Sequence, residues 1–506
     1  DAFNGSGYNL RIAFSARNSD PSIVRDILPG SASSNADNFT AANGLAYFTA
    51  DTVDAQGGPK TSLWLSDGTL NRTTRLFDFD RGATLREFTS VGSKLYFVAN
   101  NGSGNELWTS DGTIAGTKQV ADLLPGAGSS NPTELTAVGN NLFFYTNIPP
   151  AGVGQPAQRL YRLDTDSATA TPEALTTKDL TESGTFAEFN AASPSFTVIG
   201  NDLYFAARDE NLGTELWRAS VGSGGNVTLA TMILKNGAID GSLPSNLTNV
   251  NGTLYLIADV TQGNQEVVRI DTFSAVPNPS NFTVFNVNGA GDAGASKLTY
   301  NSQLNRLFFA ANDASAGNEL FTVNLADTNP APQLVRDINT LPNGSSTPTN
   351  LVNVGGRLIF SATDSDAGSP TVDGNSLWIT DGITTRKLSE LGNGLGETDF
   401  GGRLNTLTNL NQFTVIGDNL FFVADNSTIG RELRQITLSG TVAAGSGVLE
   451  GFDLFGGSTP ADPNTGTPAT PNSSGPTGLT VVGSFIFFRA NTGINSNGVE
   501  PFSVLP

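Results

Sequence analysis

The sequence contains no cysteine and no histidine, and only one methionine, among its 506 residues. Without cysteine the fold is not held by disulfides, and cysteine usage says nothing about the redox compartment. Without histidine the chain lacks the commonest general base and metal ligand, so serine-triad, cysteine-nucleophile and histidine–metal mechanisms are excluded for its own residues. Paired Asp and Glu side chains could still hydrolyse glycosides.

Positive charge is also scarce, with 27 Lys and Arg against 47 Asp and Glu and a net charge of −20. This balance argues against nucleic acid or anionic membranes as partners, because both require basic patches. No stretch approaches the roughly 18 apolar residues that span a bilayer. The first ten residues lack the basic and apolar regions of a signal peptide. The abundant Asn, Thr and Gly favour a secreted bacterial surface protein.

What the sequence does contain is a repeat built on the motif ELWTSDGT (residues 106–113). All four tryptophans occupy the same place in the repeat. Degraded copies of the motif begin at Ser62, Glu215, Glu319 and Ser376. Self-similarity of this kind indicates a repeat architecture and warns that most recurring residues build the repeat.

Each unit has the same order of expected strands. A short strand of the form [L/F]-T-x-[V/I]-G is followed by an apolar strand L-[Y/F]-F-x-A, the ELW strand, and a fourth strand V-x-D-[L/I]. Asp-Gly turns precede the fourth strand in the clearest copies. The last core residue of the second strand recurs at spacings of 47 to 66 residues, at Phe48, Phe97, Phe144, Phe205, Leu256, Phe309, Phe360, Phe422 and Phe488. Four strands per unit of about 50 residues predict an all-β fold, a single β-propeller of about nine blades.

The ends of the chain predict how the propeller closes. The ninth unit stops after its third strand at residues 500–506, and SIVRDILPG (residues 22–30) is a fourth strand without a unit of its own. We expect the N-terminal strand to complete the last blade, which removes both open edges. Donation of this strand to another molecule is the alternative. Eight or ten blades, and an open β-solenoid, also remain as alternatives.

The whole chain, residues 1–506, is therefore expected to form one domain. Residues 1–30 hold the closing strand, and a Pro/Thr/Gly-rich loop covers residues 455–477. The repeats are expected to begin near residues 38, 86, 133, 194, 245, 296, 349, 411 and 478.

Residues 106–144 resemble the bacterial ELWxxDGT repeat family, whose unit reads E-L-W-x-x-D-G-T-x-x-G-T-x-x-V-x-D-[I/L]. The match is close in the second unit, partial in the first, fourth, sixth and seventh, and reduced to the strand pattern in the others. The resemblance implies a secreted or surface-exposed context and implies no particular reaction.

The polar linkers between the second and third strands are the candidate metal sites. Each pairs an Asp or Asn with the Glu that opens the third strand, around a glycine. Hard cations such as Ca²⁺ prefer several such oxygens. The alternative is structural, with the Glu accepting turn N–H groups and the Asp forming an Asx-turn. The residues are Asn101 with Glu106, Asp209 with Glu215, Asp313 with Glu319, and Asp425 with Glu432.

Two other recurring sets are interpreted as structural. The fourth-strand aspartates Asp26, Asp122, Asp179 and Asp337 are expected to tie neighbouring blades by hydrogen bonds. The tryptophans are expected to fill the core between blades, because aromatic rings supply much buried apolar area. No carboxylate pair stands out from the repeat, so no catalytic residue is assigned.

These observations favour a non-enzymatic structural or adhesive module that assembles with copies of itself or binds proteins or glycans at the cell surface. A lectin-like glycan-binding propeller is the first alternative, and a carboxylate-dependent glycan-cleaving enzyme is the second. No cofactor is expected apart from calcium in the linkers.

Overall fold

The computed structural model contains one short 3₁₀ helix and 38 strands among the residues it describes. The described residues are 21–29, 32–126, 128–146, 159–167, 171–175, 196–209, 213–223, 225–232, 234, 241–261, 263–273, 281–289, 291–341, 344–364, 376–388, 407–426, 430–439, 442, 446–452, 458–459, 470–471, 473–491 and 499–505. Asp179, predicted to tie two blades, lies outside this set.

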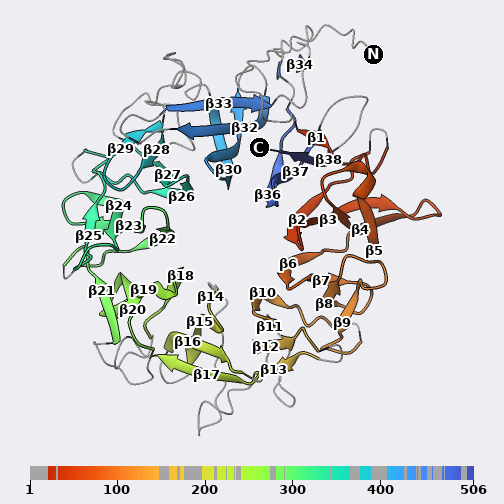
Figure 1. Ribbon diagram of the computed structural model, residues 1–506, viewed down its shortest axis with the longest axis horizontal. Helices are drawn as coiled ribbons and strands as arrows, with labels where there is room; N and C mark the ends of the chain where they lie inside the picture. The colour runs from red at the N-terminus through yellow and green to blue at the C-terminus, as the bar shows by residue number, and fades with distance from the viewer. Residues whose placement is uncertain are drawn as a thin grey trace. The chain divides into compact units, whose positions relative to one another are not determined.

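Nine sheets of four antiparallel strands follow one another along the chain, so the fold is a nine-bladed β-propeller. Within a blade, consecutive strands pair in order from first to fourth, as the labels in Figure 1 show. The prediction of about nine four-stranded blades is confirmed. Within the described residues, no helix has the length and apolar character needed to cross a bilayer.

The strands of the first five blades are as follows. Blade 1 has β2 (Asp37–Ala42), β3 (Leu45–Val53), β4 (Pro59–Ser66) and β5 (Thr74–Asp80), with the helix η1 (Leu70–Arg72); blade 2 has β6 (Arg86–Val91), β7 (Lys94–Asn100), β8 (Asn105–Ser110) and β9 (Lys118–Ala121); blade 3 has β10 (Thr133–Val138), β11 (Asn141–Thr146), β12 (Arg159–Asp164) and β13 (Glu173–Ala174); blade 4 has β14 (Thr197–Ile199), β15 (Asp202–Asp209), β16 (Gly213–Val221) and β17 (Val227–Met232); blade 5 has β18 (Ser245–Val250), β19 (Thr253–Thr261), β20 (Asn264–Ile270) and β21 (Phe282–Phe285).

The remaining four blades are built in the same way. Blade 6 has β22 (Ser296–Asn301), β23 (Arg306–Asp313), β24 (Gly317–Asn324) and β25 (Pro332–Leu334); blade 7 has β26 (Thr349–Val354), β27 (Arg357–Ala362), β28 (Ser376–Thr380) and β29 (Thr385–Lys387); blade 8 has β30 (Leu407–Ile416), β31 (Asn419–Asn426), β32 (Gly430–Ser439) and β33 (Ser446–Phe452); blade 9 has β36 (Thr477–Val482), β37 (Phe485–Asn491), β38 (Val499–Val504) and β1 (Ser22–Ile23). Two short strands, β34 (Ser458–Thr459) and β35 (Thr470–Pro471), pair with each other.

Blade 9 is completed by the N-terminal strand, as the sequence predicts. Ser22 pairs with Ser503 and Ile23 with Phe502, and the Val24 amide donates to the Pro501 carbonyl at 2.9 Å. The β1 label lies beside β38 in Figure 1. Closure within one chain covers an edge of β38 that would otherwise present unpaired backbone groups.

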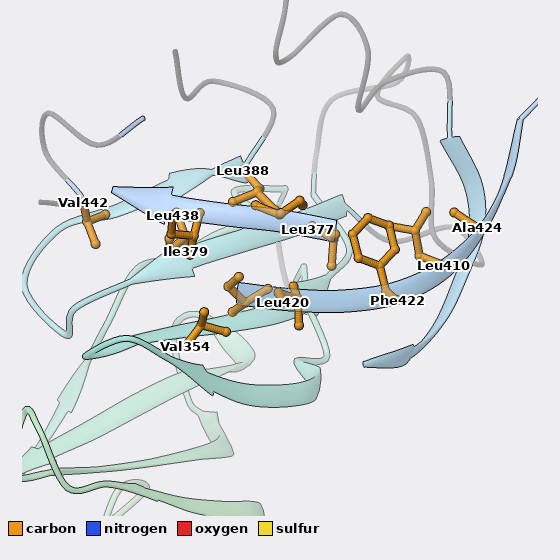
Figure 2. Packing of buried hydrophobic residues seen from close by; sticks show 12 residues of the cluster. Val354, Leu377, Ile379, Leu388, Leu410, Leu420, Phe422, Ala424, Leu438 and Val442 are labelled. Carbon is orange, nitrogen blue, oxygen red and sulfur yellow. The ribbon is translucent and has the colours of Figure 1, made fainter. Parts of the chain in front are cut away.

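The apolar core lies between blades, because the second and third strands are covered on both faces. Figure 2 shows one cluster, in which Leu420 and Phe422 of β31 pack with Val354, Leu377 and others from blade 7. Leu420 and Phe422 are fully buried. Each such side chain stabilises the fold by roughly 1.5–3 kcal/mol relative to an exposed one.

The chain divides into two compact units, each assembled from several blades. One comprises Asp1–Ala83, Val352–Ser361 and Asp366–Pro506, and the other comprises Thr84–Leu351 and Ala362–Ser365. Blades 1, 8 and 9 belong to the first unit and blades 2 to 6 to the second.

Candidate functional site

The glutamate that opens the third strand is buried and fully engaged in blade 2. Glu106 on β8 has no exposed surface. Its Oε1 accepts the Ser130 amide at 2.8 Å, and its Oε2 accepts the Ser130 hydroxyl at 2.5 Å and the Leu123 amide at 3.2 Å. Ser130 lies in the connection that leads to blade 3. We call this arrangement a glutamate–serine lock.

The same lock recurs in four other blades, each time with a serine in the connection to the following blade. The pairs are Glu215 with Ser242, Glu319 with Ser346, Glu432 with Ser474, and Glu500 with Ser34. The serine carbonyl accepts an amide from the second strand of the following blade in several cases, for example Asp259 N–H to Ser242 at 2.7 Å. The lock therefore ties the connection to both blades that it joins.

The electrostatics of the locks follow from their burial. Desolvation raises the pKa of Glu106, Glu319 and Glu500, because burial disfavours the charged form. The serine hydroxyl and the backbone amides oppose this shift by donating hydrogen bonds to the carboxylate. These local donors thus offset part of the cost of burying the carboxylates.

The residues predicted to hold a metal have separate structural environments. Asp313 accepts the Ser315 hydroxyl and the amides of Ser315 and Ala316, which makes an Asx-turn. Asp425 forms an ion pair with Arg431 at 3.0 Å. Asn101 lies exposed in a bend, and the side chain of Asp209 lies outside the described residues. The four glutamates, Glu106, Glu215, Glu319 and Glu432, are the lock residues.

Across the described part of the chain, no group of three or more acidic side chains is placed to hold a metal ion. Calcium at the linkers stays a prediction. Of the structural alternative, the Asx-turn is observed at Asp313, whereas Glu106 accepts amides from the connection to the next blade and not from its own linker turn.

The other recurring residues have the following positions. All four tryptophans are buried, and Trp217 packs with Val138, Phe143 and Tyr145 of the preceding blade. Its Nε1 donates to the Ala207 carbonyl at 3.1 Å. Asp26 has a buried Oδ1 that accepts no hydrogen bond from any described residue. The tie expected from the fourth-strand aspartates is made instead by the third-strand glutamates.

A second recurring feature, absent from the sequence predictions, is a β-bulge in the first strand. In seven blades the register between first and second strands slips near the start of the first strand. One residue at this point adopts a left-handed conformation, with φ between 49° and 73°, and Asn350 at the equivalent position of blade 7 does the same. The residues, called bulge residues below, are Asn38, Glu87, Glu134, Asn246, Lys297, Asn350, Gln412 and Gly478.

The bulge is stabilised by a threonine two residues further on. Its hydroxyl donates to the carbonyl of the bulge residue, as Thr136 does to Glu134 at 3.0 Å and Thr299 to Lys297 at 3.0 Å. In the sequence, the bulge residue is the variable first position of the pattern x-[F/L]-T. Because its residue type differs from blade to blade, the sequence analysis did not identify it.

The side chains of the bulge residues differ in what they contact. Glu87 accepts the amide of Glu134, the bulge residue of the next blade, at 2.9 Å, and Gln412 accepts that of Gly478 at 2.8 Å. Lys297 is exposed and Glu134 is half-buried. Neither forms a side-chain hydrogen bond or ion pair with another described residue. Burial and the nearby Glu87 carboxylate raise the pKa of Glu134.

Comparisons with known proteins bear on the fold of this chain and not on its activity. No family model matches the sequence, and no curated protein matches it. Solved structures similar to the chain include a prolyl endopeptidase (14% identity, TM-score 0.40, 79% of this chain and 55% of that one), an acylaminoacyl peptidase from Pyrococcus horikoshii (9%, 0.34, 83% and 60%) and a puromycin hydrolase (12%, 0.39, 94% and 61%). The chain thus spans little more than half the length of these proteins.

These comparisons correct two expectations. The protein was expected to be a non-enzymatic structural or adhesive module, and not an enzyme. The solved structures to which it is similar are instead enzymes of the peptidase kind, which contradicts both expectations. At this identity and TM-score the likeness is one of fold, and the activities of those proteins are not transferred by it.

Proposed function

We propose that this protein is a propeller domain that binds a peptide-like ligand at the bulges of its first strands, as the substrate-binding part of an enzyme. The ligand would contact side chains that differ from blade to blade. The recurring residues already form the locks, the turns and the core. The bulge residues are the polar side chains that differ between blades.

The observation that carries the proposal is the strain at Glu134 and Lys297. A left-handed conformation costs a residue other than glycine about 1 kcal/mol or more, and Asn tolerates it best. Three blades have Asn at this position and one has Gly. Glu87 and Gln412 offset the strain by bonding to the next blade. Glu134 and Lys297 form no such side-chain hydrogen bond within the described residues, so their charged groups can bind a ligand.

The chemistry of the two side chains supports a peptide as the ligand. A carboxylate suits an ammonium group and an ammonium suits a carboxylate, and a peptide carries both. Both residues belong to the second compact unit. The chain has no histidine, so a nucleophile–histidine pair would have to come from outside it. The secreted context implied by the ELWxxDGT resemblance stays a prediction.

Substitution with asparagine tests this function. Glu134→Asn and Lys297→Asn relieve the left-handed strain, so we expect each variant to melt at the same temperature as the wild type or higher. Each should also lose roughly tenfold or more in affinity for short peptides with free termini, because a charge-assisted hydrogen bond is lost. Calorimetric titration with short prolyl peptides whose amino and carboxyl termini are free measures the affinity, and differential scanning calorimetry measures the melting temperature.

Asn246→Gly is the matched control, because it changes a bulge residue without removing a charge and should leave affinity unchanged. Unaltered affinity in both asparagine variants, or no peptide binding by the wild type, would contradict the proposal. For the enzyme context, peptidase activity is expected only when the chain is joined to a catalytic part that supplies histidine. Histidine-independent peptidase activity of the isolated chain would overturn that part of the proposal.

A further inference from the structure

Blade 5 departs from the lock arrangement at a single pair of positions. Glu266 on β20 is only 1% exposed and pairs in register with Ala258. The lock glutamates also face an alanine in the second strand, as Glu319 faces Ala311. Glu266 is therefore the lock glutamate of its blade.

Its partner position is occupied by Ala293 and not by serine. The Ala293 carbonyl accepts the Asn312 amide at 2.6 Å, as the Ser242 carbonyl accepts that of Asp259. The next residue, Gly294, has φ 50°, close to the 46° of Asn131, which follows Ser130. The connection thus follows a similar course, but it lacks the serine hydroxyl, and its Ala293 amide donates to Asn264 and not to the glutamate.

The loss leaves Glu266 without the hydroxyl donor, and only the Val287 amide and the Asn264 side chain lie near enough to stabilise its charged form. Neither of its oxygens accepts a hydrogen bond from a described residue, and the Ala293 amide donates to Asn264 Oδ1 at 3.2 Å. A buried carboxylate without donors is costly when charged and much less so when neutral. Burial raises the pKa of Glu266 to about 7, against the weaker opposing effects of the Val287 amide and the Asn264 side chain.

The charges around Glu266 do not compensate it. Asp292, in the same connection, raises its pKa further and itself accepts the amides of Gln265 and Gly294. Asp259 at the end of β19 accepts the amides of Gly263 and Asn264. In the fourth strand, β21, the residues Phe-Thr-Val-Phe carry no titratable group.

Among the described residues, the flanking blades and β20 itself supply no cation to Glu266 either. Glu215 of blade 4 is held by Ser242. Arg269 on β20 is paired with Asp271 at 2.6 Å, and Lys297 on the first strand of blade 6 is exposed.

We propose that the connection between blades 5 and 6 is a proton-operated junction, which is closed when Glu266 is a neutral acid and loosens when Glu266 ionises. Ionisation places an anion that has no serine donor beside Asp292 in a buried site. The connection responds because Glu266 lies where other blades have the lock, and the remaining hydrogen bonds between this connection and the start of β20 run to Asn264 and Gln265 and not to the glutamate. The locked junctions retain their hydroxyl donor, so this junction should respond more strongly near neutral pH than they do.

Hydrogen exchange measured by mass spectrometry tests the junction. Between about pH 5 and about pH 8, protection of the amides in residues 291–301, corrected for intrinsic rates, should fall roughly tenfold or more. Ala293→Ser restores the hydroxyl, and Glu266→Gln removes the titrating group. Both variants should keep the protection of this segment constant over the same range.

The comparison variant is Ser346→Ala, which removes the hydroxyl donor from Glu319 in blade 6 but keeps the amides of residue 346 and Ile338 on this carboxylate. It should make the protection of the segment that follows residue 346 depend on pH, though less strongly than that of residues 291–301. Constant protection of residues 291–301 in the wild type would overturn the proposal. So would pH dependence that persists in both Ala293→Ser and Glu266→Gln.

Discussion

Ser130 donates its hydroxyl and its amide to a carboxylate that no solvent reaches. A hydrogen bond to a charged group stabilises a protein more than a hydrogen bond between neutral groups. A buried charged group without a hydrogen-bond partner destabilises the folded state by a larger amount. Glu106 is therefore tolerated in the interior because a single residue of the next connection supplies two of its donors. At the scale of residues, the protein contains a set of equivalent glutamate–serine locks, and blade 5 has an alanine in place of the serine.

Ser130→Ala is predicted to destabilise the protein by about 1.5–3 kcal/mol, the usual value for a hydrogen bond to a charged group. The loss should be larger at pH 8 than at pH 5, because the substitution raises the pKa of Glu106 further above its unfolded value. Thermal unfolding at both pH values measures it. Ser90→Ala, at a half-buried position on β6, is the control and should stay within about 0.5 kcal/mol of the wild type. Equal stability of the two variants would contradict the role of the lock.

At the scale of elements, two devices join consecutive blades. The locks hold the connections, and the first-strand bulges bond to neighbouring bulges, as Glu87 does to Glu134. The closing strand β1 is only two residues long, yet Val24 beside it is 1% exposed and packs with Trp64 and Phe487. A short element can matter this much because it completes a sheet and covers an edge.

Removal of residues 1–25 is predicted to lower the melting temperature and to promote self-association, because β38 would then present unpaired backbone groups along one edge. Removal of residues 1–20, which leaves β1 in the chain, is the matched control. Light scattering after size-exclusion chromatography, together with calorimetry, distinguishes the two truncations. A monomeric, equally stable 26–506 fragment would show that β1 contributes little to closure.

For the whole molecule, the buried glutamates give an unusual dependence of stability on pH. The folded-state pKa of Glu106, Glu266, Glu319 and Glu500 is raised, so the folded state binds protons more strongly and gains stability as pH falls. For Glu266, a rise from 4.5 to about 7 corresponds to ~3 kcal/mol, present below about pH 4.5 and lost as pH rises to about 7. The pKa of Asp67, Asp111 and Asp313 is lowered, so their contribution disappears at acid pH.

The melting temperature should therefore be highest on the acid side of neutrality, between about pH 4.5 and about pH 6, and should fall toward pH 8. Glu266→Gln should flatten the fall on the alkaline side more than any other single glutamine variant among the lock glutamates. A scan of melting temperature against pH tests this. A stability that rises steadily from pH 5 to pH 8 is the contrary result.

Much of the fold was predictable because the same strand pattern recurs many times along the chain. The L-[Y/F]-F strands are largely apolar in each blade, so the chain has few other ways to bury them. The match of residues 22–30 to a fourth strand predicted closure for the same reason. The site was less predictable. Glu106, Glu215, Glu319 and Glu432 were singled out as metal candidates, and their equivalents Glu266 and Glu500 were not. Ser130 lies 24 residues beyond Glu106, and nothing local links the two.

The sequence by itself thus determined the strand order, the blade count and the closing strand, because these depend on local patterns of apolar residues and turns. Only the tertiary structure decided which residues meet across a connection. It showed that a third-strand glutamate is buried and hydrogen-bonded to a distant serine, that blade 5 has Ala293 in place of this serine, and that Glu134 and Lys297 adopt a left-handed conformation. Hydrogen bonds between residues far apart in the chain, and the backbone angles of a bulge, arise only when the strands are assembled.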